Sequence, residues 1–133
     1  MKKKIELLNP TNSAYSLFGT SGVWIQQTNT GGGSPFVRGL TGNQTLIMID
    51  GIRLNNSTFR YGPNQYLNTI NVNSIERIEV MRGSGSVQYG SDALGGTVHF
   101  LTKMPTINAN DSNLNVGLNA KYLSNDMEKS GLM

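Results

Sequence analysis

Two glutamates, Glu76 and Glu79, come nearest in this chain to the type and spacing of a catalytic pair. Two carboxylates held around one substrate atom can act as general acid and general base. These two lie three residues apart within an apolar run, 75–81, that has the composition of a β-strand. Side chains alternate between the faces of a strand, so residues three apart point to opposite faces. We therefore predict a structural or interface role for both glutamates, and no catalytic residue.

The single histidine, His99, lies in a second apolar run between Val98 and Phe100. A haem or metal ligand is conceivable at this position, but a lone histidine on a strand is more often packed or solvated. No cofactor and no metal site are predicted. Three serines could act as nucleophiles only with this histidine as base, so hydrolase chemistry is not expected either; they are Ser34, Ser84 and Ser91.

Arg38 and Arg82 each follow an apolar run and each precede a glycine. One interpretation is an exposed arginine whose stem covers apolar surface while its head stays in water. The other is an anchor for an acidic partner, because guanidinium forms bidentate pairs with carboxylates that survive partial burial. The residues alone leave both interpretations open.

The segment 55–61 is the best candidate for ligand contacts. It combines hydrogen-bonding side chains with two aromatic rings and one cation, the set that suits an amphipathic small molecule; the residues are Asn55, Asn56, Ser57, Thr58, Phe59, Arg60 and Tyr61. A solvated loop would look similar. The glycine-rich segment 31–34 lacks the lysine and helix of a phosphate-binding loop, and we interpret it as a tight turn.

Composition excludes several classes of protein. The chain has 133 residues, enough for one modest core, and no cysteine, so disulfides and thiol chemistry are absent. Its net charge of +3 comes largely from Lys2, Lys3 and Lys4, which argues against nucleic-acid binding. No apolar run has the length of a membrane-spanning helix, and no apolar core follows the basic start as it would in a signal peptide.

Short strands and long loops account for most of the chain. We expect a short helix after the capping residues 10–13, a helical turn at 84–89 and a turn at Asp50-Gly51. Loops are predicted at 28–34 and 55–73, and a linker at 105–113. The strands are predicted at 23–27, 35–38, 45–49, 52–54, 75–81 and 97–102. From residue 114 to residue 122 apolar and polar residues alternate over about the length of a transmembrane β-strand.

Three blocks in this order, GGGSPFVRGL, LIMIDGIRLNN and the whole of 74–103, resemble the plug domain of TonB-dependent outer-membrane receptors. The resemblance implies an α+β fold: a small mixed β-sheet plug with short helices and long loops, followed by the first strand of a transmembrane β-barrel. It divides the chain into a basic tail (1–4), the plug (5–104), a linker (105–113) and a barrel strand with its turn (114–133). We expect the rest of the barrel to be missing from this chain.

The resemblance also implies roles for individual residues. Arg38 and Arg82 would pair with glutamates on the inner barrel wall, with Glu76 and Glu79 also in plug–barrel contact. Loops 28–34, 41–44 and 55–66 would form the floor of the substrate site. The ligand-binding residues would be Asn29, Thr30, Asn43, Asn55, Asn56, Phe59, Arg60 and Tyr61.

The implied function is that of an outer-membrane receptor in a Gram-negative bacterium. It would bind a small extracellular nutrient, such as a siderophore, haem or cobalamin, and open under the control of TonB. No TonB box is apparent ahead of the plug, so the chain alone should neither transport nor bind TonB productively. The alternative is a secreted or surface β-rich binding module that acts by itself. Such a module would unfold cooperatively in isolation, whereas a plug would be marginally stable without its barrel.

Overall fold

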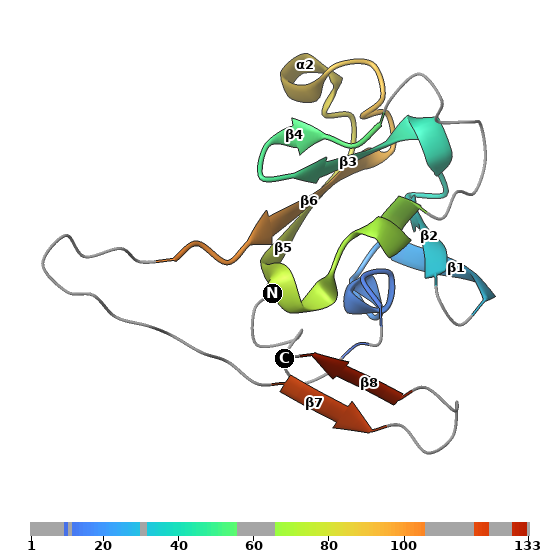
Figure 1. The fold of residues 1–133 in the computed structure, drawn as a ribbon. Helices are drawn as coiled ribbons and strands as arrows, with labels where there is room; N and C mark the ends of the chain where they lie inside the picture. Colours follow the sequence, from blue (N-terminus) through green and yellow to red (C-terminus); the bar gives the residue numbers. More distant parts are fainter. Residues whose placement is uncertain are drawn as a thin grey trace, which may run out of the picture.

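A four-stranded mixed sheet is the centre of the molecule. In the computed structural model the structure describes residues 10, 12–29, 32–55, 66–105, 119–122 and 129–132. The strands lie in the order β4-β3-β6-β5 (Figure 1). Strands β3 and β6 are parallel, and the outer strands β4 and β5 are antiparallel to their neighbours. The bounds are Thr45–Ile49 for β3, Ile52–Arg53 for β4, Ile75–Arg82 for β5 and Gly96–Thr102 for β6.

The main core lies on one face of this sheet. Alternate residues of the two central strands, such as Ile47, Val98 and Phe100, point to that face and are buried. The opposite face carries a smaller cluster in which Leu46 and Met48 contact residues near a short helix, α2 (Ser86–Tyr89). Both faces of β3 are therefore covered, which explains its nearly continuous apolar sequence.

A hairpin of two strands covers the main core from the other side. Strand β1 (Val23–Asn29) pairs antiparallel with β2 (Gly32–Val37), and the hairpin lies beside the four-stranded sheet (Figure 1). Val37 is fully buried, and Val23 and Ile25 pack against the same core.

The predicted loop at 28–34 is wrong in its extent. Strand pairing continues through Gln27 opposite Gly33, and Asn29 lies opposite Gly32, with one irregularity in register between Gln27 and Asn29. The glycines therefore serve close approach within a strand. A Cβ atom on Gly33 would lie 2.9 Å from the carbonyl oxygen of Gln26 and 2.9 Å from a methyl group of Ile25. The sequence suggested a turn because glycine is common both in tight turns and in strands where another chain segment approaches closely.

The Asp50-Gly51 turn between β3 and β4 is confirmed. Asp50 has φ 48° and Gly51 has φ 86°, and two residues with positive φ define the hairpin turn that Asp-Gly sequences favour. Its tip lies beside the end of β6, because the N–H of Asp50 donates to the carbonyl oxygen of Phe100 at 3.0 Å.

Short 3₁₀ turns join the strands. The helix predicted after residues 10–13 is the single turn η1 (Tyr15–Leu17), where Asn12 accepts a hydrogen bond from the N–H of Tyr15 at 2.9 Å. Turn η2 (Gly42–Gln44) precedes β3. The second half of the predicted 55–73 loop contains η3 (Tyr66–Thr69) and η4 (Val72–Ser74), so a long unstructured loop is wrong for that half. Leu67 anchors η3 in the main core. The sequence did not predict this contact, because the residues around Leu67 are mostly polar.

Strand β5 contains an irregularity that corrects the argument about Glu76 and Glu79. The register with β6 shifts between Ile75 and Arg77, so Glu76 lies at a β-bulge. As a result Ile75 and Ile78, three residues apart, are both buried in the main core. The simple alternation that placed the two glutamates on opposite faces therefore does not hold across this bulge.

The C-terminal segment forms a separate hairpin in which β7 (Asn119–Tyr122) pairs antiparallel with β8 (Lys129–Leu132). Strand β7 agrees with the second half of the predicted strand at 114–122, whose first half lies outside the described residues, as does most of the predicted linker. Strand β8 was not expected, because four residues are too few to show a pattern. The predicted α+β fold, a small mixed sheet with short helices and long loops, is confirmed.

Candidate functional site

Arg38 and Arg82 lie close together, although they come from different strands. Arg38 follows β2 in a tight turn with φ 56°, and its N–H donates to the carbonyl oxygen of Gly22 at 3.3 Å. Arg82 ends β5, and its Cδ atom would lie 2.9 Å from a Cβ atom on Gly22. A Cβ atom on Gly83 would in turn lie 3.5 Å from Nη1 of Arg38. The structure thus brings both guanidinium groups to one part of the surface.

Neither arginine has an acidic partner among the residues that the structure describes. Arg82 donates from Nη1 to Oγ and O of Ser21 over 3.3 and 3.4 Å. The side chain of Arg38 makes no hydrogen bond or ion pair within the described part of the chain. Both residues are exposed. Two adjacent exposed cations can bind a carboxylate supplied from outside the described residues.

The two glutamates of β5 are not brought to these arginines. Glu79 pairs with Arg77 on the same strand at 2.9 Å, and both side chains are about half exposed. Such a surface pair contributes little to stability, about 0–1 kcal/mol. Glu76 is partly buried at the bulge. The predicted role of both glutamates in plug–barrel contacts stays a prediction.

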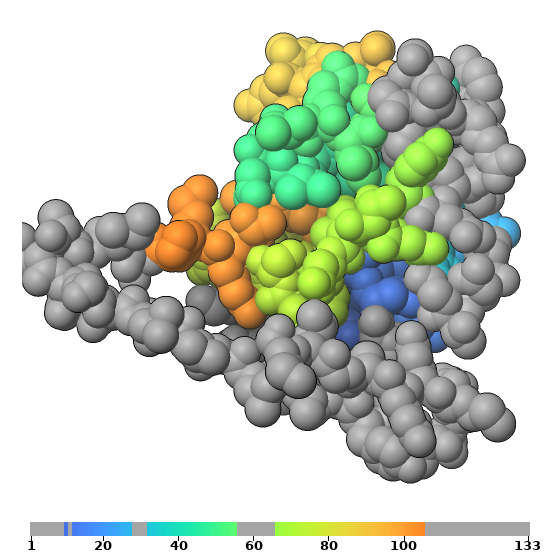
Figure 2. Space-filling model, viewed as in Figure 1, coloured from blue at the N-terminus to red at the C-terminus, as the bar shows by residue number. Residues whose placement is uncertain are grey.

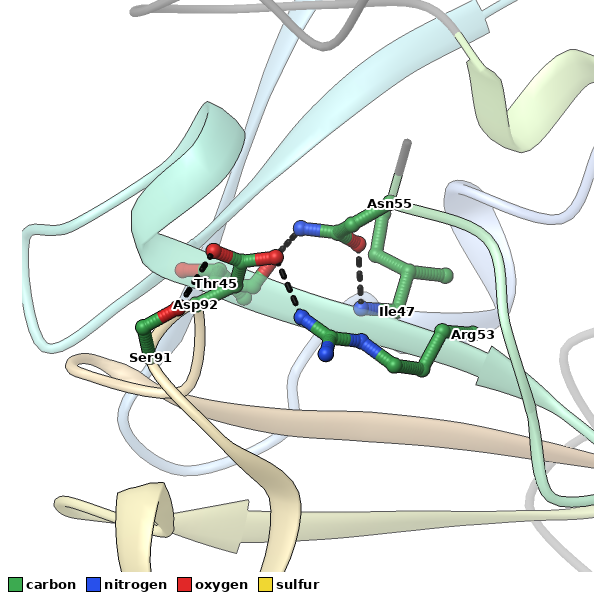
Figure 3. Close-up of polar contacts among 6 residues, drawn as sticks. All are labelled: Thr45, Ile47, Arg53, Asn55, Ser91 and Asp92. Carbon is green, nitrogen blue, oxygen red and sulfur yellow. Dashed lines mark hydrogen bonds and ion pairs between the residues drawn. The ribbon is translucent and has the colours of Figure 1, made fainter. Parts of the chain in front are cut away.

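Asn55 is held by the backbone of β3 (Figure 3). Its Oδ1 accepts the N–H of Ile47 at 2.9 Å and its Nδ2 donates to the carbonyl oxygen of Thr45 at 3.1 Å. The side chain is 9% exposed. An amide that satisfies one donor and one acceptor of a strand works as a short extension of the sheet. In this structure the side chain of Asn55 is therefore engaged with the backbone of β3, and its predicted contact with a ligand stays a prediction.

Next to Asn55, Arg53 connects β4 to the loop after α2. Its guanidinium forms an ion pair with Asp92, and Ser91 donates to the same carboxylate at 3.3 Å. Figure 2 shows the α2 segment lying directly against β4, where this pair forms. Sequence reasoning did not identify this link, because residues 53 and 92 carry no signal of their proximity.

Described residues on either side of segment 56–65 lie next to the other loops predicted to bind a ligand. Asn55, at its start, bonds to Thr45 directly after η2, which carries Asn43. Just after its end, Asn68 of η3 lies against β2, where its side chain would overlap a Cβ atom on Gly32. The Oδ1 atom of Asn43 is buried without a hydrogen bond. Of the remaining predicted ligand residues, Asn29 ends β1, and Thr30, Asn56, Phe59, Arg60 and Tyr61 lie outside the described residues.

A second polar cluster joins the β3–β4 turn to the end of β6. The Asp50 carboxylate accepts the N–H of Thr102 at 2.8 Å and its hydroxyl at 2.7 Å. These two hydrogen bonds hold the pKa of Asp50 below its ordinary value of 3.8. His99 accepts the N–H of Gly51 at Nε2, over 2.9 Å. Sequence reasoning missed this cluster, since it could not know that β3 and β6 are neighbours.

The described residues contain no group of three histidine, aspartate or glutamate side chains arranged to hold a metal ion. Within the same residues, no helix combines the length and hydrophobicity needed to span a lipid bilayer.

Comparison with known proteins defines the class to which this fold belongs. The profile of the TonB-dependent receptor plug domain matches residues 2–97. The chain is 37% identical over 126 residues to the vitamin B12 transporter BtuB of Vibrio vulnificus (strain YJ016), covering 87% of this chain and 19% of that protein. It is 34% identical over 102 residues to BtuB of Photobacterium profundum, covering 76% of this chain and 16% of that protein.

Solved structures agree with the sequence relatives. The siderophore receptor PirA from Acinetobacter baumannii superimposes with a TM-score of 0.62 at 28% identity, covering 79% of this chain and 17% of the receptor. PiuA from the same organism gives a TM-score of 0.58 at 28% identity, over 80% of this chain and 14% of the receptor. The chain belongs to the family of TonB-dependent receptor plug domains, and it spans 13–19% of the length of the curated relatives that it matches.

Proposed function

We propose that this chain is the plug of an outer-membrane receptor that imports a small nutrient in a Gram-negative bacterium. The observation that carries the proposal is the family match across residues 2–97, on a chain with the mixed sheet and hairpin described above. The relatives are named as a vitamin B12 transporter and as siderophore receptors. A plug of this kind closes the lumen of a large barrel and opens when TonB acts on it from the inner membrane.

The size of the native protein tests this proposal. An antibody raised against the peptide 55–66 would be used on outer-membrane and soluble fractions of the source cell. We expect a band several times heavier than the 14.5 kDa chain, found only in the outer membrane. A band at the size of the chain itself, in soluble or secreted material, would instead establish a free-standing binding module and reject the transport function.

The arginine pair supports a more specific part of the proposal, in which Arg38 and Arg82 anchor the plug to carboxylates on the barrel wall. Both guanidiniums lie at one place on the surface without an acidic partner among the described residues. Replacement of both by alanine in the whole receptor should increase pore leak. Arg77→Ala is the matched control, because Arg77 is an exposed arginine of the same strand β5 that already pairs with Glu79. Equal leak in the double variant and the control would reject the anchoring role.

The ligand would rest on segment 56–65 together with the neighbouring ends of the β1–β2 hairpin and η2. The supporting observation is that hydrogen bonds and packing of the flanking residues Asn55 and Asn68 join these loops. Replacement of Phe59, Arg60 and Tyr61 by alanine in the whole receptor should weaken ligand binding. Affinity unchanged from the parent receptor would show that the substrate site lies elsewhere.

A further inference from the structure

The β3–β4 turn is attached to β6 by side chains that can change charge. Gly51 donates its N–H to Nε2 of His99 at 2.9 Å, and the Asp50 carboxylate receives two hydrogen bonds from Thr102. Directly after Thr102, the N–H of Lys103 donates to the carbonyl oxygen of Ser74, and the chain then leaves the sheet. The attachment thus joins a hairpin tip to the last residues of the central sheet (Figure 1).

The hydrogen bond from Gly51 determines the protonation state of His99. A ring nitrogen that accepts an N–H must carry no proton, so this geometry requires a neutral imidazole with its proton on Nδ1. Protonation of Nε2 would place two donors against each other. Histidine is the side chain that ordinarily gains a proton between about pH 8 and 5.

Charged groups lie around His99 on the neighbouring strands. Within the sheet, His99 lies opposite Met48 of β3 on one side and opposite Glu79 of β5 on the other. Arg53 of β4 lies opposite Met48 and so belongs to the same row. Residues opposite one another share a face of the sheet. The cations in this group are already paired, Arg53 with Asp92 and Arg77 with Glu79. Asp50 interacts electrostatically with the imidazole. A protonated ring therefore has two carboxylates near it, those of Asp50 and Glu79.

We propose that His99 is a pH-responsive clasp: the neutral ring holds the β3–β4 turn through Gly51, and the protonated ring releases Gly51 and pairs with the carboxylates of Asp50 and Glu79. Release leaves the tip of the hairpin attached to β6 only through Asp50. This clasp belongs to the folded chain itself and does not depend on the transport function proposed above.

Two variants of the native protein, compared with the parent, separate the clasp from ordinary packing. His99→Gln places an amide oxygen, Oε1, about where Nε2 of the imidazole lies, so it can accept from Gly51 at every pH, and it does not titrate. His99→Leu removes the acceptor at every pH. Hydrogen–deuterium exchange of a peptide containing Gly51 is compared at about pH 7.5 and about pH 5.5, on either side of the histidine range. A peptide from β2 serves as the internal control, since β2 belongs to the separate β1–β2 sheet.

We expect the parent protein and His99→Gln to exchange alike at the higher pH. At the lower pH the parent should exchange roughly fivefold to tenfold faster than His99→Gln, the effect of losing one hydrogen bond. His99→Leu should exchange rapidly at both values. Three outcomes would each overturn the clasp: the same ratio of exchange rates between the parent and His99→Gln at both pH values, slow exchange in His99→Leu at the higher pH, or equal acceleration of the β2 peptide. Nitrogen NMR of the imidazole gives a second readout, since the chain contains one histidine and its signals are assigned without ambiguity. A proton on Nε2 of the neutral ring would also overturn the clasp.

Discussion

At the scale of single residues, the most informative polar groups connect strands that are distant in sequence. Asp50 and Asn55 are both near the ends of the short β4 strand, and each bonds to the backbone of another part of the sheet. Their neighbours Gly51 and Arg53 make the contacts to His99 and Asp92. A strand of two residues has little pairing of its own, so these side chains fix its position.

Asp50 should titrate below the ordinary carboxyl value of 3.8, because two hydrogen bonds from Thr102 stabilise the charged form. A pKa that is lower in the folded than in the unfolded chain stabilises the fold above the unfolded pKa. That contribution is lost as pH falls through the folded pKa. The chemical shift of the Thr102 amide proton reports the titration. Thr102→Val, which removes the hydroxyl donor, should raise the midpoint. A midpoint at or above 3.8 in the parent chain would contradict this account.

Asn55→Ala should destabilise the start of β3. The change leaves the buried N–H of Ile47 without an acceptor, which costs about 1–3 kcal/mol. Exchange of the Ile47 amide should therefore accelerate by about tenfold or more, since about 1.4 kcal/mol corresponds to a factor of ten. Asn55→Asp keeps an acceptor for the N–H of Ile47 but turns an oxygen, in place of the Nδ2 donor, toward the carbonyl oxygen of Thr45, so this variant should be destabilised as well. Exchange of Ile47 that is the same in Asn55→Ala and the parent would show that the side chain does not hold the strand.

At the scale of elements, the β1–β2 hairpin depends on the absence of a side chain at Gly33. Gly33→Ala would place a Cβ atom 2.9 Å from the carbonyl oxygen of Gln26, so the hairpin must shift, at a cost of about 1–3 kcal/mol. Gly39→Ala is the control: nothing lies within 4 Å of its Cβ, and only its φ of 83° opposes the change, at about 1–2 kcal/mol. Thermal unfolding of the two variants compares the effects. Gly33→Ala that unfolds at the parent temperature would mean that the hairpin adjusts freely.

Elements that depend on local signals could be predicted from the sequence, and those that depend on contacts between distant residues could not. Strand β3, the Asp50-Gly51 turn and α2 are short-range features, and all three agree with expectation. The parallel pairing of β3 with β6 and the bulge at Glu76 depend on partners far along the chain. The same limit applies to the site: the arginine motifs were visible, but their proximity across Gly22 and Gly83 was not.

At the scale of the whole molecule, the described surface carries large apolar side chains on several elements. Several large apolar side chains are more than half exposed, and they come from different elements: Phe18, Trp24, Ile52, Val87, Leu94 and Met104. Trp24 is 61% exposed and contacts Phe36 edge-on, with 5.0 Å between ring centroids. A contiguous apolar patch is typical of a surface that meets a partner, whereas single exposed apolar side chains are common on any protein. Under the function proposed above, a barrel wall would cover such groups.

Trp24→Cys provides the test of that enclosure, because the chain has no cysteine of its own. In the isolated chain the new thiol should react with a maleimide rapidly, as expected for a position that is 61% exposed. In the whole receptor the reaction should be at least about tenfold slower, because burial in a packed interface excludes solvent and reagent. Ala93→Cys, at a position that is fully buried within the plug, should react slowly in both settings and so reports on the integrity of the fold. Rapid labelling of Trp24→Cys in the receptor, with Ala93→Cys still protected, would show that the β1–β2 hairpin faces solvent and that the barrel wall does not cover it.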